Sequence, residues 1–365
     1  MKIYNVAIVG CGNISSIYFN NLTKVFKNIH VAACCDLDAE KTKLATETYG
    51  IQKVMTLEEI LNSAEIDVIL NITTPKTHYD ICKRALLAGK HVYVEKPLSL
   101  KFEQGSELVE LARQKGLYLG CAPDTFLGAG IQTCIKLIDD GFIGKPIAAT
   151  AFMTCHGHES WHPDPEFYYE VGGGPMFDMG PYYLTALVSL LGPAETVCGM
   201  TKISFENRTI TSEKKYGQNI KVEVPTHVAG TIKFKNGCIA TMITSFDIWQ
   251  STLPRIEIYG SAGTLVVPDP NTFGGPVLLK GKEIPLTHIY EENSRGLGLS
   301  DMVYSIENDI PNRANGELAC HVLEIMSAFH ESSDTGIYYK MKSVCKKPQP
   351  METELFKGYI SRSQL

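Results

Sequence analysis

Apolar residues in the first 122 positions of the chain alternate between two spacings. Short, continuous apolar runs predict buried strands, and the stretches between them repeat apolar residues every three to four positions, as amphipathic helices do. The predicted strands span 3–9, 30–35, 67–73, 91–95 and 117–121, and the predicted helices span 14–27, 39–49, 57–63, 77–88 and 101–115. Because continuous apolar strands that alternate with helices are typical of parallel sheets covered on both faces, we predict a doubly wound α/β domain.

The pattern changes from residue 123 onward. Two helices are predicted, with a loop rich in Gly, Pro and His between them, and a series of strand-like segments separated by turn signals follows. The helices span 130–140 and 181–191, the loop 155–176, the strands 220–224, 227–234, 238–247, 254–260 and 263–267, and a last helix 316–331. Strands grouped after helices predict an α+β domain with an open, mostly antiparallel sheet. We therefore divide the chain into domains 1–122 and 123–365.

Composition supports a folded two-domain chain and argues against nucleic acids and membranes as its partners. The chain has 365 residues, of which 44% are hydrophobic and 20% charged, as in globular proteins of about two domains. A net charge of −6 offers no basic excess for a nucleic acid, and apolar stretches such as 184–192 are too short to cross a membrane. The N-terminus shows no apolar leader with a cleavage site. Eleven cysteines without a C-x-x-C pair predict reduced thiols in a cytoplasmic protein.

A glycine-rich turn ends the first predicted strand. Gly10, Cys11, Gly12, Asn13, Ile14 and Ser15 follow the pattern G-x-G-x-x-G, with serine as the third small residue. Gly10 permits the tight turn, and Gly12 lets a pyrophosphate approach the start of the next helix, whose free N–H groups and dipole favour negative charge. Between a strand and a helix, this motif predicts a dinucleotide-binding Rossmann domain, with a glycine turn that binds no ligand as the alternative.

Asp36 ends the second predicted strand. A carboxylate at this position accepts hydrogen bonds from both ribose hydroxyls of an adenosine and repels a 2′-phosphate. No arginine follows nearby, although Lys41 and Lys43 do. We therefore predict NAD rather than NADP as the cofactor, and the alternative is an exposed acid at a strand end.

Polar residues also follow the third and fourth predicted strands. Because ligands of doubly wound sheets bind at the carboxyl ends of the strands, we expect these residues to line the cofactor site. They are Thr73, Thr74, Pro75 and His78 after one strand, and Glu95 and Lys96 after the next. A lysine held before a proline at such a place is more typical of a site than of a solvated surface.

Residues 73–99 resemble the signature of the Gfo/Idh/MocA family, in which a T-P segment with a histidine lies about 20 residues before an E-K-P triplet. The resemblance begins at the N-terminal glycines, continues through residues 172–184 and extends weakly to about residue 267. It implies hydride transfer between a nicotinamide cofactor and a hydroxyl of a sugar, cyclitol or related polyol. It also implies that the sheet of the second domain makes oligomer contacts, so we expect a homodimer or homotetramer.

The resemblance assigns roles to three residues. Lys96 matches the catalytic lysine of the family, and Asp178 matches its aspartate after G-G-G. Tyr182 falls four residues later, where most members have histidine, and tyrosine resembles the branch that includes glucose-fructose oxidoreductase and dimeric dihydrodiol dehydrogenase. Oxidation of an alcohol needs a base for the hydroxyl proton, and Tyr182 needs a nearby ammonium such as Lys96 to favour its phenolate. The alternative for Tyr182 is a packed helix tyrosine beside Tyr183.

The loop around His156 invites a metal interpretation, because His158 and His162 are four residues apart. Gly157 and the proline after His162 disfavour the helix that such a site needs, and the resemblance implies no metal. We favour recognition of substrate hydroxyls by His158 and His162, with Trp161 stacking on a sugar face, over packing of the loop and over zinc.

The remaining candidates are less well marked. Asp124 follows the fifth predicted strand, where it binds a substrate hydroxyl or caps a turn. Arg313 and His321 lie near the last helix without an assigned role. Two alternatives to a dehydrogenase stay open: a redox-neutral enzyme that recycles tightly bound NAD, and a sugar-sensing regulatory protein without catalysis. The joint presence of Lys96, Asp178 and Tyr182 argues against the regulatory protein.

Overall fold

The computed structural model describes residues 1–364, and its first 121 residues form the predicted doubly wound domain. A six-stranded sheet has the order β3-β2-β1-β4-β5-β6, and all its pairings are parallel. Its elements are β1 (Tyr4–Val9), α1 (Ser15–Lys24), β2 (Ile29–Cys35), α2 (Ala39–Tyr49), β3 (Lys53–Val54), α3 (Leu57–Asn62), β4 (Val68–Asn71), α4 (Pro75–Leu87), β5 (His91–Val94), α5 (Phe102–Lys115) and β6 (Leu119–Cys121). The sequence pattern missed only β3, an exposed two-residue edge strand without an apolar run.

The second sheet has nine strands in the order β16-β15-β14-β13-β7-β12-β11-β8-β17. Only β7 and β12 pair in parallel, so the sheet is mostly antiparallel, as expected. Its strands are β7 (Pro146–Thr154), β8 (Ala194–Lys202), β11 (His227–Phe234), β12 (Ile239–Ser245), β13 (Ile256–Gly260), β14 (Gly263–Val267), β15 (Val277–Leu279), β16 (Lys282–Ile284) and β17 (Tyr339–Lys340).

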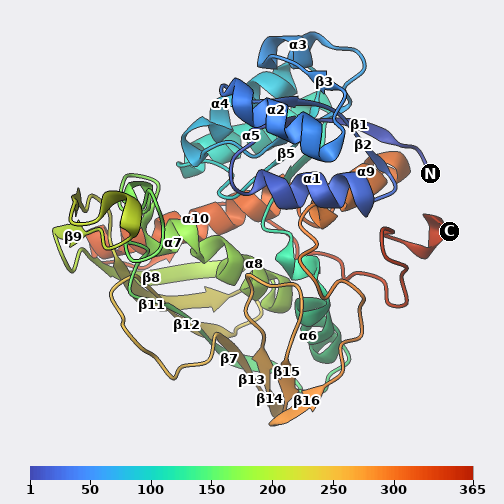
Figure 1. The fold of residues 1–365 in the computed structure, drawn as a ribbon. Coiled ribbons are helices and arrows are strands. Elements are labelled where there is room, and N and C mark those ends of the chain that lie inside the picture. Colours follow the sequence, from blue (N-terminus) through green and yellow to red (C-terminus); the bar gives the residue numbers. More distant parts are fainter. Residues whose placement is uncertain (365) are drawn as a thin grey trace.

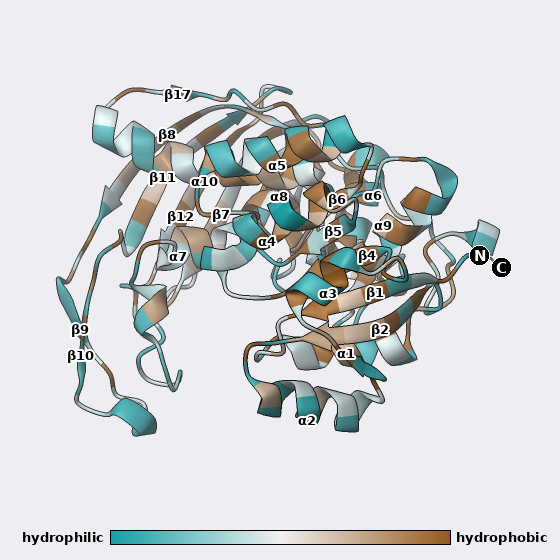
Figure 2. Cartoon of the chain, turned by 90° about the horizontal axis from the view of Figure 1, so that it is seen from above, coloured by the Kyte–Doolittle hydropathy of each residue, from teal (hydrophilic) through white to brown (hydrophobic). Residues whose placement is uncertain are grey.

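Five helices accompany this sheet within the described residues. They are α6 (Ala129–Asp139), α7 (Gly174–Asp178), α8 (Gly180–Leu191), α9 (Leu297–Asn308) and α10 (Gly316–Thr335), with short 3-10 turns at 125–127, 166–168, 213–215 and 362–364. No helix within residues 1–364 is both long and apolar enough to cross a lipid bilayer. In Figure 2 the strands β1 and β2 of the first sheet are largely in apolar colours, whereas the strands of the second sheet and the outer helix α2 mix apolar and polar colours.

Several elements differ from the sequence prediction. The predicted strand 220–224 is β10 (Asn219–Lys221), which pairs only with β9 (Asn207–Thr209) in a hairpin that stands away from the main sheet (Figure 2). Strands β7 and β8 were missed because they have one covered face and one open face, and Ala and Thr dilute their alternation. Helix α9 was missed because its first turn contains glycine and serine.

The chain after β16 returns to the first domain. Helix α9 packs against β6, and α10 packs against α5 on one side and β8 on the other, so α10 lies between the two sheets (Figure 1). Within the first domain, Gly120 leaves room for Tyr93 and Met302, because a Cβ at this position would lie 2.5 Å from the tyrosine ring. The carboxyl ends of the first sheet therefore face helices of the second domain. The boundary after residue 122 remains a prediction.

Candidate active site

The glycine turn after β1 has the geometry that a pyrophosphate requires. Gly10 has φ +105°, and a Cβ at this position would lie 2.7 Å from the carbonyl oxygen of Ile72, so only glycine fits. A Cβ on Gly12 would meet nothing within 4 Å, so the backbone there faces open space. Helix α1 begins after Ile14 without a side-chain cap, so its dipole faces the turn, although the Ser15 N–H already donates to the Gly12 carbonyl oxygen at 3.0 Å. These residues fit a dinucleotide, with Asn13 in the same turn.

Asp36 lies against this turn. Its Oδ2 accepts a hydrogen bond of 2.7 Å from the backbone N–H of Cys11, and its Oδ1 accepts one of 2.9 Å from that of Asp38. The carboxylate is therefore held at the edge of the dinucleotide turn, at the position expected for a ribose contact.

His78 is buried and joins two loops at the carboxyl ends of β4 and β5. Its Nδ1 lies 2.7 Å from the carbonyl oxygen of Pro97, and its Nε2 lies 3.1 Å from that of Thr73. Burial lowers the pKa of His78, and the neutral imidazole that this favours donates to one of the two carbonyl oxygens only. Thr74 and Pro75 begin α4, so this helix starts at the same loops. The structure thus places His78 behind the loops, where it orients the backbone around the site.

Lys96 and Asp178 connect the two domains. Lys96 follows β5, and its ammonium donates to the Oδ1 of Asp178 at 2.9 Å and to the Asp178 carbonyl oxygen at 2.7 Å. Glu95 holds the lysine backbone, because its carboxylate accepts from the N–H of Lys96 at 2.9 Å and from the Tyr18 hydroxyl at 2.7 Å. Asp178 ends α7, so the pair spans the interface between the first sheet and the helices of the second domain.

The ionised states of this pair support each other. Burial by itself would lower the pKa of Lys96, but Asp178, Tyr182 and Glu95 together outweigh it and raise that pKa. Burial likewise opposes ionisation of Asp178, but the Lys96 ammonium and the nearby His158 lower its pKa to about 2. An ammonium and a carboxylate are therefore present together across the neutral pH range.

Tyr182 lies in the first turn of α8, beside Lys96. The Lys96 ammonium lies 5.3 Å from the centroid of the tyrosine ring. Burial raises the pKa of Tyr182, and Lys96 opposes this rise without cancelling it. The Lys96 ammonium therefore favours the phenolate of Tyr182 as expected, but the protonated phenol remains the stable form at neutral pH.

His158 lies on the other side of Asp178. Its Nε2 is 3.4 Å from the Oδ2 of the aspartate, and neither ring nitrogen has a hydrogen-bond partner within residues 1–364. The imidazole packs among the rings of Trp161, Tyr168 and Phe246, at centroid distances of 5.3, 4.1 and 4.7 Å. Buried polar atoms without partners require an explanation, and a ligand hydroxyl supplies one.

The other aromatic residues of the loop have different surroundings. His162 accepts a hydrogen bond of 3.0 Å from the backbone N–H of Asp164 through its Nδ1. His156 stacks on Trp249, at a centroid distance of 3.4 Å, and does not join His158. Trp161 is 60% exposed. In the part of the chain that the structure describes, no three His, Cys, Asp or Glu side chains are grouped as a metal site requires.

Three sequence candidates have partners that indicate structural roles. Asp124 is buried, and its Oδ2 accepts from the N–H groups of Gly296 and Gly298 at 2.8 and 3.0 Å, which favours a capping role at the start of α9 over a substrate contact. Arg313 pairs with the buried Asp301. His321 accepts from the backbone N–H of Ala194 at 2.9 Å and lies 2.7 Å from the Ser343 hydroxyl.

Sequence reasoning missed two residues beside the site. Tyr168 contacts His158, and burial raises its pKa to about 12. Arg295 lies next to Tyr182 and opposes the rise in the pKa of that tyrosine, while donating to the Oδ1 of Asn271 at 2.8 Å. The sequence indicated Tyr168 only weakly, because this residue lies in the His-rich loop. Arg295 lies in a loop just before α9, where no sequence motif indicates a functional site.

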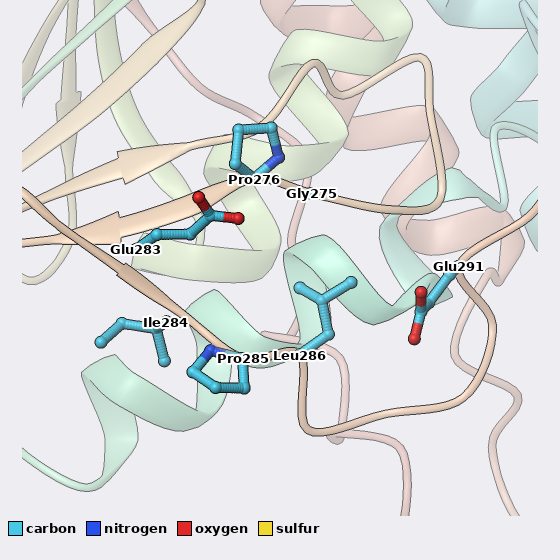
Figure 3. A pocket seen from close by; sticks show the side chains of 7 residues that line it. All are labelled: Gly275, Pro276, Glu283, Ile284, Pro285, Leu286 and Glu291. Carbon is cyan, nitrogen blue, oxygen red and sulfur yellow. The ribbon is translucent and has the colours of Figure 1, made fainter.

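A separate hollow lies near β15 and β16 (Figure 3). Its lining is Gly275, Pro276, Glu283, Ile284, Pro285, Leu286 and Glu291. None of the residues assigned to the cofactor or substrate is among them. This hollow therefore lies apart from the Lys96–Asp178 pair.

Comparisons with known proteins match both parts of the chain to one family and to solved structures of the same fold. Residues 4–122 match a family described as an oxidoreductase family with an NAD-binding Rossmann fold, and residues 131–266 match the GFO/IDH/MocA C-terminal domain. The D-glucoside 3-dehydrogenase of Escherichia coli is 26% identical over 348 residues, which cover 91% of this chain and 95% of the relative. An NAD-binding oxidoreductase from Klebsiella pneumoniae has a TM-score of 0.81 at 18% identity, covering 93% of this chain and 99% of its own. Levoglucosan dehydrogenase, solved with NADH and L-sorbose, has a TM-score of 0.78 at 17% identity, with coverages of 93% and 99%.

Proposed function

Since this chain belongs to the GFO/IDH/MocA oxidoreductase family, with an NAD-binding Rossmann domain, we propose that it transfers a hydride between nicotinamide and a hydroxyl or keto carbon of a sugar, sugar derivative or cyclitol. The observation that carries the proposal is the Lys96–Asp178 pair at the carboxyl ends of the parallel strands, with Tyr182 against it. The E. coli relative is named a glucoside dehydrogenase, which supports a sugar as the substrate.

The cofactor side of the site is formed by the first domain. Gly10, Gly12, Asn13 and Ile14 would hold the pyrophosphate, and Asp36 the adenosine ribose. Two loops would surround the nicotinamide, one containing Thr73, Thr74 and Pro75 and the other containing Glu95 and Lys96. His78 packs against the backbone of both loops and would keep them in position. Bound NAD supplies the hydride acceptor in oxidation and NADH the donor in reduction. Asp36 supports a preference for NAD over NADP.

On the substrate side, Lys96 and Tyr182 form the acid–base pair, and Asp178 and His158 lie beside them. Lys96 is an ammonium that binds the reacting oxygen and stabilises the negative charge that develops on it. Tyr182, as a phenol, donates a proton to that oxygen during reduction, and its phenolate accepts one during oxidation. Asp178 holds Lys96 in place and, with His158, accepts and donates hydrogen bonds to a neighbouring substrate hydroxyl.

The central experiment is a screen of sugars and cyclitols with NAD and NADP, with reduced cofactor measured by its absorbance. We expect turnover with at least one substrate, and Lys96→Ala should lower kcat by about 10²–10⁴, the usual effect of positioned acid–base catalysis. Lys101→Ala, at an exposed lysine near the same strand, is the matched control. Retained cofactor with product formation but no net reduction would indicate the redox-neutral enzyme instead. Binding of a sugar without any turnover would indicate the regulatory protein.

A further inference from the structure

Aromatic side chains continue outward from Asp178 along the loop between β7 and α7. His158 lies against the aspartate, and Trp161 packs edge-on against His158, at 5.3 Å between centroids. Phe167 packs against His162 and Tyr168, at 5.3 and 4.0 Å. These rings form one continuous cluster that begins at the site and ends in solvent.

The outer end of this cluster is exposed. Trp161 is 60% exposed and Phe167 is 49% exposed, although both pack on other rings. Apolar surface that remains exposed at the edge of a polar site is typical of a ligand subsite. His158 contacts both Asp178 and Trp161, so the tryptophan lies one ring further out from Asp178 than the imidazole does. This is the position of a group linked to a sugar that Asp178 holds.

The base of this loop is held in a defined position. Arg208 of β9 is buried and pairs with Glu159 at 2.8 Å, and its guanidinium also donates to the carbonyl oxygen of Phe246. A second buried ion pair joins Arg208 to Asp247. Because Glu159 follows His158 directly, this network fixes the loop that bears Trp161 without help from a ligand. The aromatic surface is therefore preorganised.

The charged residues of the loop are already paired. Asp164 pairs with Lys214 at 2.7 Å and with Lys215 at 2.9 Å, and Glu166 also pairs with Lys215. No cation of this set remains free for a phosphate or a carboxylate. The surface at Trp161 therefore suits an uncharged group that stacks on an aromatic ring.

We propose that Trp161 and Phe167 form a subsite for the group linked to the sugar that reacts, so the preferred substrate is a neutral glycoside rather than the free sugar. The inference rests on the proposed function, since it takes Asp178 as the group that holds the reacting ring. The apolar faces of an aglycone or of a second sugar ring stack on Trp161, while the first ring occupies the site at Lys96.

The test compares the best free sugar from the screen with its methyl and phenyl glycosides. We expect a higher kcat/KM for the phenyl glycoside than for the free sugar. Trp161→Ala should reduce the ratio of these two kcat/KM values by about five- to tenfold. Trp161→Phe keeps an aromatic face, so its ratio of kcat/KM values should stay close to that of the unaltered protein. Thermal unfolding checks that the variants fold.

Binding is also followed without turnover. The chain has two tryptophans, so Trp249→Phe leaves Trp161 as the only one. Its fluorescence should change on titration with the phenyl glycoside and much less with the free sugar. Turnover of the free sugar together with an unaltered ratio in Trp161→Ala would overturn the subsite and leave the dehydrogenase function intact. Fluorescence that depends on protein concentration instead of ligand would also overturn it, because a second copy of the chain would then cover Trp161.

Discussion

At the scale of single residues, Tyr182 distinguishes catalysis from packing most directly. Tyr182→Phe keeps the buried ring and removes only the hydroxyl. If the hydroxyl transfers the proton, the variant should fold normally and lose most of its kcat, by about 10²–10⁴. Tyr183→Phe, in the next position of α8, is the matched control. Near-normal kcat in Tyr182→Phe would leave Lys96 as the only proton donor and acceptor.

The direction of the reaction should depend on pH through the same residue. Burial raises the pKa of Tyr182, so its phenolate forms only at high pH. Oxidation, which needs the phenolate, should therefore become faster as pH rises, whereas reduction, which needs the phenol, should become slower at high pH. Asp178, with a pKa of about 2, stays ionised and adds no step near neutral pH. Rate profiles of both directions, repeated with Tyr182→Phe, check this assignment.

Asp36 should determine the choice of cofactor. Its carboxylate, held by two backbone N–H groups, repels a 2′-phosphate and accepts from the ribose hydroxyls of NAD. We expect NAD to bind more tightly than NADP, and Asp36→Ala to narrow the difference. Calorimetric titration of each cofactor measures both affinities. Equal or tighter binding of NADP by the unaltered protein would contradict the prediction.

His158 should act on the substrate and not through a metal. Its imidazole lies 3.4 Å from Asp178, so His158→Ala should raise KM or change the preference among sugars. Treatment with a chelator should leave activity unchanged. Stoichiometric zinc that is lost together with activity would refute this role, and elemental analysis before and after chelation detects it.

At the scale of elements, the start of α9 depends on Asp124. Asp124→Ala leaves two buried N–H groups without an acceptor, which should cost about 1–3 kcal/mol of folding free energy. Burial raises the pKa of this carboxyl from 3.8 to about 6, so its contribution to stability is largest at low pH and falls as pH rises from about 4 to 6. Asp124→Asn keeps an acceptor without the charge. Its melting temperature relative to the unaltered protein should therefore rise over that range, and a constant difference would contradict the burial argument.

At the scale of the whole molecule, one face of the nine-stranded sheet is left open by the helices. Strand register places Met200, Ala229, Ile243 and Phe152 in one row across this face. An apolar row on an uncovered sheet is typical of an interface between copies of a chain, and we propose a homodimer or homotetramer through it.

Replacing one residue of this row tests the assembly. Met200 is 78% exposed, so Met200→Asp should not disturb the fold, but it should weaken the oligomer by burying a charge in the interface. Val344→Asp, at an exposed position outside the sheet, is the control. Sedimentation of the three proteins reports their masses. A monomeric unaltered protein, or an unchanged mass for Met200→Asp, would exclude this interface.

The sequence by itself determined the first domain and its glycine turn. Parallel strands buried on both faces appear as continuous apolar runs, so five of the six strands were predicted close to their observed bounds. The turn at Gly10 is equally local, because its positive φ depends on a single residue. The Lys96 motif was also found from the sequence, since its residues follow strands that end at one edge of a sheet.

Only the tertiary structure decided how distant residues combine. Strands β7 and β8 show weak patterns because one face of their sheet is open. The capping role of Asp124 depends on Gly296 and Gly298, far along the chain. The protonation of Tyr182 depends on its burial between domains, and the contact of His158 with Asp178 depends on a loop anchored by Arg208. The burial of a side chain and the pairing of its charge depend on neighbours that are distant in the sequence. The fold brings these neighbours together, so a pattern of adjacent residues does not predict them.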